Sequence, residues 1–205
     1  RAAEAAHGPI GTAVVNAGLG YLGPLVGMSD DDVDRMLRTN LFGAVETIRA
    51  VLPGMVERHH GRIALVSSVL GKTAIPGCAL YVATKWALVG LGRALRMELA
   101  PFGVTVTTVL PGRTETEFFD VMKTRAFRRW TTSRAGTGHT ADAVARTLVA
   151  ATESGRREIT VGFVNRLVVA AMNLCPGTSE FALGRAAARE MIEASGRATS
   201  SGRLS

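Results

Sequence analysis

Short apolar runs alternate with longer segments of helical periodicity along most of this chain. The runs at residues 12–16, 63–66 and 104–110 consist largely of valine, alanine, isoleucine, leucine and threonine, and they predict buried parallel strands. A shorter run at 157–161 predicts a last strand. Because helical segments separate these runs, the pattern predicts an α/β fold built on a doubly wound parallel sheet.

The first long amphipathic segment begins at Ser29. Three aspartates follow it, and together they predict a capped helix with acidic residues at the positive end of the helix dipole. The apolar face of this helix continues to Val51 and contains one polar residue, Asn40. Such an asparagine can be a satisfied core amide or a functional residue. Pro53 is expected to bend or end the helix.

Three further helices are predicted later in the chain. One begins near Tyr81 and places leucines on one face through Leu99. Thr140 is the expected cap of the next, and residues 182–194 predict a terminal helix.

Residues 18–23 match the Gly-x-Gly-x-x-Gly pattern letter for letter. In a dinucleotide-binding turn these glycines open directly into a long helix, whose N-terminus holds the pyrophosphate. Here Pro24 and Gly27 follow, and the next helix signal is Ser29. The segment is therefore predicted to be a loop after a strand.

Three side chains suited to acid–base chemistry are grouped around one strand end. The strand at 63–66 ends at Ser67 and Ser68, and Tyr81 and Lys85 lie one turn apart on the helix that follows. A free phenol has a pKa near ~10, and a neighbouring cation lowers that value. A serine hydroxyl can hold a carbonyl oxygen while the phenol protonates it. The sequence thus predicts that the three side chains meet around one reacting oxygen.

These residues resemble the active-site signature of the short-chain dehydrogenase/reductase family, in which a serine precedes a Tyr-x-x-x-Lys motif. The resemblance implies a Rossmann-like fold and hydride transfer between NAD or NADP and an alcohol or carbonyl substrate. Three more segments agree with the family in order and spacing: Asn16-Ala17-Gly18, the helical stretch 38–43 with Asn40, and Pro111-Gly112 with Thr116.

The resemblance also implies a role for each residue. Tyr81 is the expected acid/base, and Lys85 is expected to lower its pKa and to hold the nicotinamide ribose. Ser68 is expected to position the substrate oxygen, and Asn40 to anchor a water relay. Cofactor contacts are implied for Asn16, Ala17, Gly18, Tyr81, Lys85, Pro111, Gly112 and Thr116.

The family's glycine-rich turn, Gly-x-x-x-Gly-x-Gly, and its first strands do not occur in this sequence. We therefore expect an N-terminally truncated sheet of about four strands, forming an incomplete catalytic domain over 1–194, and a disordered tail over 195–205. The strand at 12–16 becomes an open apolar edge, which favours self-association. An inactive fragment that acts, if at all, through protein contacts is the alternative to an enzyme.

Residues 114–137 mix large apolar side chains, among them Phe118, Phe119 and Trp130, with lysine and arginine. One hypothesis is a lid whose inner side is apolar, which implies a hydrophobic substrate. An ordinary surface helical hairpin explains the same pattern and stays open.

Composition adds limits on partners and location. The net charge is +7, but the arginines are scattered, so no nucleic-acid partner is expected. Cys78 and Cys175 are far apart in sequence, which predicts no metal site and no disulfide framework, and fits the reducing cytoplasm. Cys78 is expected to pack inertly or to line the cleft.

Two apolar stretches are long enough to raise the question of a membrane span. Residues 10–28 contain five glycines and a proline, and 163–174 is short and carries Arg166. No span is therefore predicted, and 163–174 is expected to be a docking helix or a surface patch. The expected partners are a small alcohol or ketone and further copies of this chain, as a dimer or tetramer.

Overall fold

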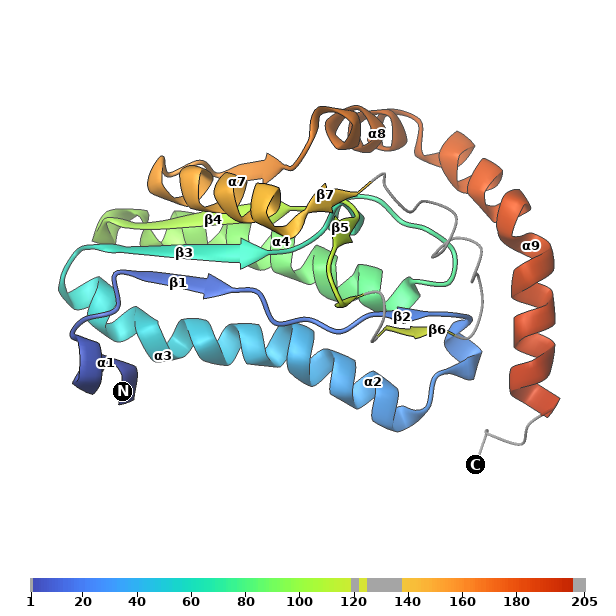
Figure 1. Cartoon of the computed structure of the whole chain (residues 1–205), viewed down its shortest axis with the longest axis horizontal. Coiled ribbons are helices and arrows are strands. Elements are labelled where there is room, and N and C mark those ends of the chain that lie inside the picture. The colour runs from blue at the N-terminus through green and yellow to red at the C-terminus, as the bar shows by residue number, and fades with distance from the viewer. Residues whose placement is uncertain (1, 119–121, 125–137, 201–205) are drawn as a thin grey trace.

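The computed structural model of this chain describes residues 2–118, 122–124 and 138–200. Four parallel strands form its central sheet in the order β1-β3-β4-β8, as Figure 1 shows. The doubly wound α/β architecture predicted from the sequence is confirmed. The strands are β1 (Thr12–Val15), β3 (Gly61–Val66), β4 (Val104–Leu110) and β8 (Glu158–Thr160).

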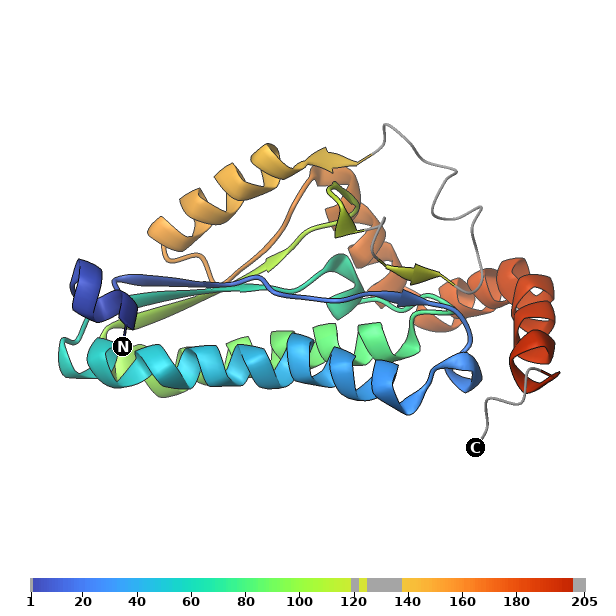
Figure 2. The same ribbon diagram turned by 60° about the horizontal axis from the view of Figure 1, so that its bottom comes forward.

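Helices cover both faces of this sheet (Figure 2). On one face lie α4 and a continuous helical rod made of α2, the π-helical turn η2 and α3, whereas α7 lies on the other face. The helices are α2 (Asp30–Leu37), η2 (Arg38–Phe42), α3 (Gly43–Glu57), α4 (Ala79–Leu99) and α7 (Ala141–Glu153).

The main hydrophobic core fills the space between the sheet and the layer formed by α3 and α4. Small and β-branched strand residues meet larger helix side chains there, which is how a low-aromatic chain still excludes water. Its buried members are Ala13, Val15, Ala44, Ile48, Val51, Met55, Ile63, Leu65, Leu88, Leu95, Leu99, Val104 and Val106.

Local sequence signals explain where α2 begins, but they do not explain why the helical rod continues past Pro53. The Ser29 side chain accepts a hydrogen bond from the Asp32 backbone N–H at 3.3 Å, so the predicted cap is present. Pro53 does not end the helix, because α3 continues to Glu57. Met55 lies beyond the proline and is fully buried, and its packing offsets the backbone hydrogen bond that proline removes.

The C-terminal region consists of α8 (Phe163–Leu174) and α9 (Pro176–Ser200). Residues 195–200 are therefore helical, where a disordered tail was predicted, and 201–205 lie outside the described residues. Ala194 is buried in a second apolar cluster and anchors this part of the helix. No helix in the described part of the chain is both long and apolar enough to cross a bilayer.

Short elements gather at the carboxyl ends of the strands. The segment 18–23 opens into no long helix, as predicted, but it is a loop only in part, because residues 21–22 form β2 before a short 3-10 turn. Two parallel pairs, β2 with β6 and β5 with β7, flank this region. These elements are β2 (Tyr21–Leu22), β5 (Thr114–Glu115), β6 (Lys123–Thr124) and β7 (His139–Thr140), with the turns η1 (Leu25–Gly27) and η3 (Val69–Gly71). At the opposite end, α1 (Ala2–His7) precedes β1 and the turn η4 (Ala100–Phe102) precedes β4.

Candidate active site

Ser68 stands between the end of β3 and the 3-10 turn η3. Its hydroxyl accepts a hydrogen bond from the Leu70 N–H at 3.2 Å, so it caps the turn. The neighbouring Val69 N–H donates to the Pro111 carbonyl at 2.9 Å, which ties the turn to the end of β4. Two strand ends therefore hold the serine in place.

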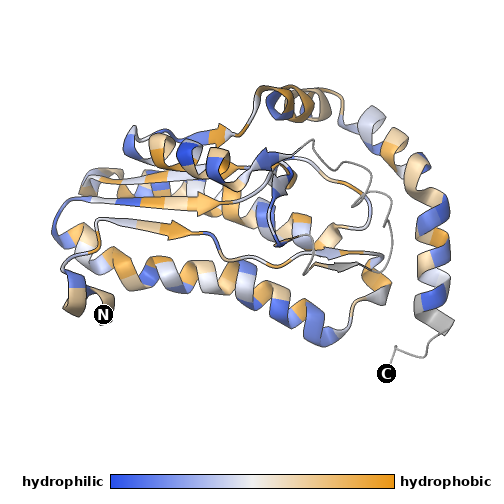
Figure 3. Ribbon diagram, in the orientation of Figure 1, coloured by the Kyte–Doolittle hydropathy of each residue, from blue (hydrophilic) through white to orange (hydrophobic). Residues whose placement is uncertain are grey.

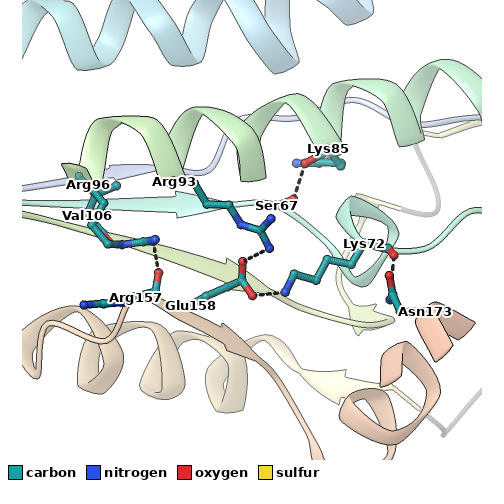
Figure 4. Close-up of polar contacts among 9 residues, drawn as sticks. All are labelled: Ser67, Lys72, Lys85, Arg93, Arg96, Val106, Arg157, Glu158 and Asn173. Atoms are coloured by element: carbon teal, nitrogen blue, oxygen red, sulfur yellow. Dashed lines mark hydrogen bonds and ion pairs between the residues drawn. The ribbon is translucent and has the colours of Figure 1, made fainter. Parts of the chain in front are cut away.

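Lys85 lies on α4 and reaches back to the same strand end. Its ammonium donates to the Val66 carbonyl at 3.0 Å and lies 5.7 Å from the centre of the Tyr81 ring. The Ser67 hydroxyl donates to the Lys85 carbonyl at 2.8 Å, a contact drawn in Figure 4. The structure thus brings Ser68, Tyr81 and Lys85 together, as the sequence predicted.

Burial dominates the protonation of this group. Burial raises the pKa of Tyr81 to about 12, while its side-chain hydrogen bond with Ser68 lowers the pKa and the Cys78 thiol raises it. Burial likewise lowers the pKa of Lys85 from 10.5 to about 8. The net shift of the Tyr81 pKa is upward here, and the lowering expected of Lys85 stays a prediction. Loss of water around the phenol outweighs the hydrogen bond with Ser68, which acts in the opposite direction.

Asn40 is fully buried in the π-helical turn η2. Its side-chain oxygen accepts from the Leu19 N–H at 2.7 Å, and its amide donates to the Leu19 carbonyl at 2.9 Å and to the Thr84 hydroxyl at 3.1 Å. Thr84 donates in turn to the Tyr81 carbonyl at 2.8 Å. Sequence reasoning missed Thr84, although its place between Tyr81 and Lys85 was a usable signal.

The residues expected to contact a cofactor lie after the strands β1 and β4. A Cβ built on Gly18 would stand 3.4 Å from the Lys85 ammonium and 3.7 Å from the Asn40 side-chain oxygen. Asn16 and Ala17 precede it and are exposed, and Gly112 follows the Pro111 that holds η3. Gly112 also packs closely on the Asn165 side chain.

Thr116 is connected to Tyr81 through Phe118. Its hydroxyl accepts from the Phe118 N–H at 3.3 Å, and the Phe118 ring centre lies 5.9 Å from that of Tyr81. Met122 and Phe118 also pack against Gly20, where a Cβ would approach each of them to 2.8 Å. The lid hypothesis rests further on Phe119, Val121, Phe127 and Trp130, which lie outside the described residues.

This site suits the nicotinamide-ribose end of a dinucleotide. An ammonium has three N–H bonds, and the described residues supply Lys85 with one acceptor, the Val66 carbonyl. The others can meet ribose hydroxyls beside the open backbone at Gly18. By contrast, the loop 18–23 opens into no helix that could hold a pyrophosphate.

The sequence also led to predictions about the reactivity of Cys78 and about metal binding. Cys78 is buried beside Leu22 and Val82 in the second apolar cluster, and burial raises the pKa of its thiol to about 12. Such a thiol is unreactive at neutral pH, in agreement with a packing role. Within the described residues no group of three or more histidine, cysteine or acidic side chains is placed to bind a metal.

Known proteins resemble this chain in sequence and in fold. A sequence profile described as short chain dehydrogenase matches residues 1–126. Human retinol dehydrogenase 8 is 40% identical over 112 residues, covering 55% of this chain and 36% of that protein. Human 17-beta-hydroxysteroid dehydrogenase type 1 is 39% identical over 114 residues, covering 56% and 35%. The chain thus spans little more than a third of the length of these relatives.

A solved structure shows the same fold over most of the chain. Gluconate 5-dehydrogenase from Burkholderia cenocepacia J2315, in complex with NADP and tartrate, is 30% identical with a TM-score of 0.66. The match covers 78% of this chain and 66% of that one.

Proposed function

This chain belongs to the short chain dehydrogenase family, and from that premise we propose that it is an NAD(P)-dependent oxidoreductase acting on an alcohol or carbonyl. The observation that carries the proposal is the meeting of Ser68, Tyr81 and Lys85 at the ends of β3 and α4. The catalytic roles given to these residues and to Asn40 are part of the proposal.

In this mechanism the bound nicotinamide supplies or accepts a hydride. The Ser68 hydroxyl donates a hydrogen bond to the substrate oxygen, which holds it beside Tyr81. Because burial keeps the pKa of Tyr81 near about 12, the phenol is protonated at neutral pH and is poised to give its proton to that oxygen. In the reducing direction the phenol is then the proton donor. Lys85 supplies donors for ribose hydroxyls, and Asn40 fixes the Leu19 backbone beside it and anchors the proton relay.

We further propose a hydrophobic substrate. The Phe118 ring packs near Tyr81, and the second apolar cluster brings Ile75, Val82 and Met122 to the same end of the fold. The names of two relatives point the same way, because retinol and hydroxysteroids are large apolar alcohols.

The direct test is reduction of retinal and of a steroid ketone, followed by loss of NADPH or NADH absorbance, in wild type and in Tyr81→Phe. Removing the phenolic hydroxyl should lower kcat at least about 100-fold, while saturable cofactor binding is retained. Tyr21→Phe is the matched control, since the other tyrosine lies in β2 outside the proposed site. Turnover retained by Tyr81→Phe rejects the assignment.

The alternative is an inactive chain that works through protein contacts. It is favoured by the loop at 18–23, which offers no helix for a pyrophosphate, and by the open edge of β1, where Val14 is 49% exposed. Titration of this chain with NADPH and NADH, followed by nucleotide fluorescence, separates the two proposals. Saturable binding supports the enzyme, and no binding supports the alternative.

A further inference from the structure

A cavity of about 450 Å³ lies between α4, the end of η3 and the β8–α8 segment, and neither Ser68 nor Tyr81 lines it. This volume falls in the range of small-molecule sites. Its walls are largely apolar: Val89 and Val169 are buried, Ala170 and Gly90 leave space, and the half-exposed Trp86 ring stands at the side.

The charged side chains that line the cavity are all cationic. Lys72, Arg93 and Arg166 line it, and the lining residues include no acidic side chain. Glu158 lies behind them and pairs with both Lys72 and Arg93, as Figure 4 shows. Arg166 donates through its Nε to the Thr160 carbonyl at 3.1 Å, a bond that leaves its charge unneutralised. Three cations thus face one carboxylate, and the site has a positive excess of about two charges.

We propose that this cavity binds a small organic anion, a carboxylate or sulfonate carried on an apolar body. The body fits between the Trp86 ring and the Val89 and Val169 side chains. The anionic group then meets Arg93 and Arg166, both of which have guanidinium groups exposed enough to reach it. Guanidinium groups bind planar oxyanions through paired hydrogen bonds, which gives the pocket its selectivity for charge.

Two residues at the end of the turn that carries Ser68, Gly71 and Lys72, also line the cavity. Lys72 follows η3 directly, its ammonium binds Glu158, and its carbonyl accepts from the Asn173 amide at 3.1 Å. An anion that draws Lys72 or Arg93 away from Glu158 breaks an ion pair near the end of this turn. We therefore expect the ligand to alter turnover through Ser68, and this consequence, unlike the binding itself, rests on the proposed function.

The binding test uses two carboxylates and an uncharged amide that matches one of them in shape. 4-Phenylbutanoate and decanoate are titrated into the full chain by calorimetry, with 4-phenylbutanamide as the uncharged match of the first. Trp86 emission in a Trp130→Phe background reports the site, because the chain has two tryptophans. We expect saturable binding of at least one carboxylate, a change in Trp86 emission, and affinity for the amide at least tenfold weaker.

Variants that leave the fold intact locate the site. A Cβ on Gly90 meets nothing within 4 Å, so Gly90→Leu fills the cavity without a backbone clash. Gly184→Leu, on α9, is equally free of contacts and is the matched control. A second set of variants tests the role of charge. The double variant Arg93→Gln with Arg166→Gln is compared with the controls Arg38→Gln and Arg146→Gln. These control arginines form exposed i,i+4 ion pairs and do not line the cavity.

Each outcome decides the proposal without an activity assay. Tenfold or greater loss of carboxylate affinity in Gly90→Leu and in the double arginine variant, with both sets of controls unchanged, supports the site. Equal affinity in Gly90→Leu and Gly184→Leu overturns it, as does equal binding of the acid and the amide. No binding of either carboxylate up to about 5 mM also overturns it. If turnover is absent but binding is lost as expected, the site stands and only the proposed function fails.

Discussion

At the scale of single residues, the site is a set of buried polar groups that hold one another. Asn40 uses its oxygen and both amide hydrogens in hydrogen bonds to Leu19 and Thr84, as a satisfied core amide does. The sequence left a choice between that role and a functional one. The structure shows that the two roles are compatible, because the loop that Asn40 holds lies beside Lys85.

Asn40→Ala should therefore be destabilised even before any effect on turnover. It leaves the Leu19 N–H and carbonyl without their buried partner, at a cost of about 1–3 kcal/mol in the free energy of unfolding. Urea denaturation measures this loss. Asn173→Ala is the control, because that amide lies on an exposed residue of α8. A midpoint for Asn40→Ala equal to that of wild type would contradict the structural role.

The lowered pKa of Lys85 predicts that this residue's contribution to stability rises with pH. Its pKa is lowered by burial from 10.5 to about 8, so between these values the unfolded chain binds more protons than the folded one. The contribution of Lys85 to the free energy of unfolding then increases as pH rises, by up to roughly 3 kcal/mol.

The measurement is urea unfolding of wild type and Lys85→Met at pH values from about 7.5 to 9.5. The stability difference, wild type minus variant, should become more favourable to wild type across this window. Cys78 and Tyr81 are present in both proteins, so their opposite dependence at higher pH largely cancels. A difference that stays constant or falls would show that the lysine is not desolvated as the structure indicates.

At the scale of elements, α4 packs against the sheet at Gly92, which lies next to Thr108 of β4. A Cβ on Gly92 would clash with the Thr108 hydroxyl, whereas one on Gly90 meets nothing within 4 Å. The sequence places both glycines in the same helix and does not tell them apart. Only the packing of α4 on β4 shows which one is required.

Gly92→Ala should lower the free energy of unfolding by about 1–3 kcal/mol, because the added methyl group overpacks the contact between helix and sheet. Gly90→Ala is the matched variant in the same helix and should instead raise stability by about 0.5–1 kcal/mol, through helix propensity alone. Thermal and urea denaturation of the pair checks both signs. Similar effects of the two substitutions would mean that α4 does not sit at this depth on the sheet.

At the scale of the whole molecule, the sheet has an open edge. β1 is the first strand in the order β1-β3-β4-β8, and among the described residues it pairs on one side only, with β3. Val14 is 49% exposed there. An unpaired apolar strand edge is a template for pairing with another chain. We therefore propose that this chain self-associates through β1.

A charge on that edge should reduce the association. Val14→Lys should shift the mass measured by light scattering or sedimentation towards the monomer, since lysine disfavours strand pairing at an edge. Val149→Lys is the control, a half-exposed valine on α7 at the far side of the sheet. A wild-type chain that is monomeric at high concentration would refute the proposal, and so would equal effects of the two lysines.

The apolar surface of α8 belongs to this scale as well. Phe163, Val164, Leu167 and Leu174 are all more than half exposed, and Figure 3 shows the helix as hydrophobic over much of its length. The sequence predicted a docking helix or a surface patch at 163–174. The structure confirms a helix with an exposed apolar surface.

The sequence by itself determined the order of strands and helices, the loop at 18–23, and the grouping of Ser68, Tyr81 and Lys85. Each of these follows from near-neighbour rules: period, caps, and the meeting of parallel strand ends at one edge of the sheet. The tertiary structure alone decided that α3 passes through Pro53, that α9 extends to Ser200, and that burial sets the pKa of Tyr81. The cavity beside Trp86 also emerged only there. These features depend on water excluded by distant segments, which no local pattern records.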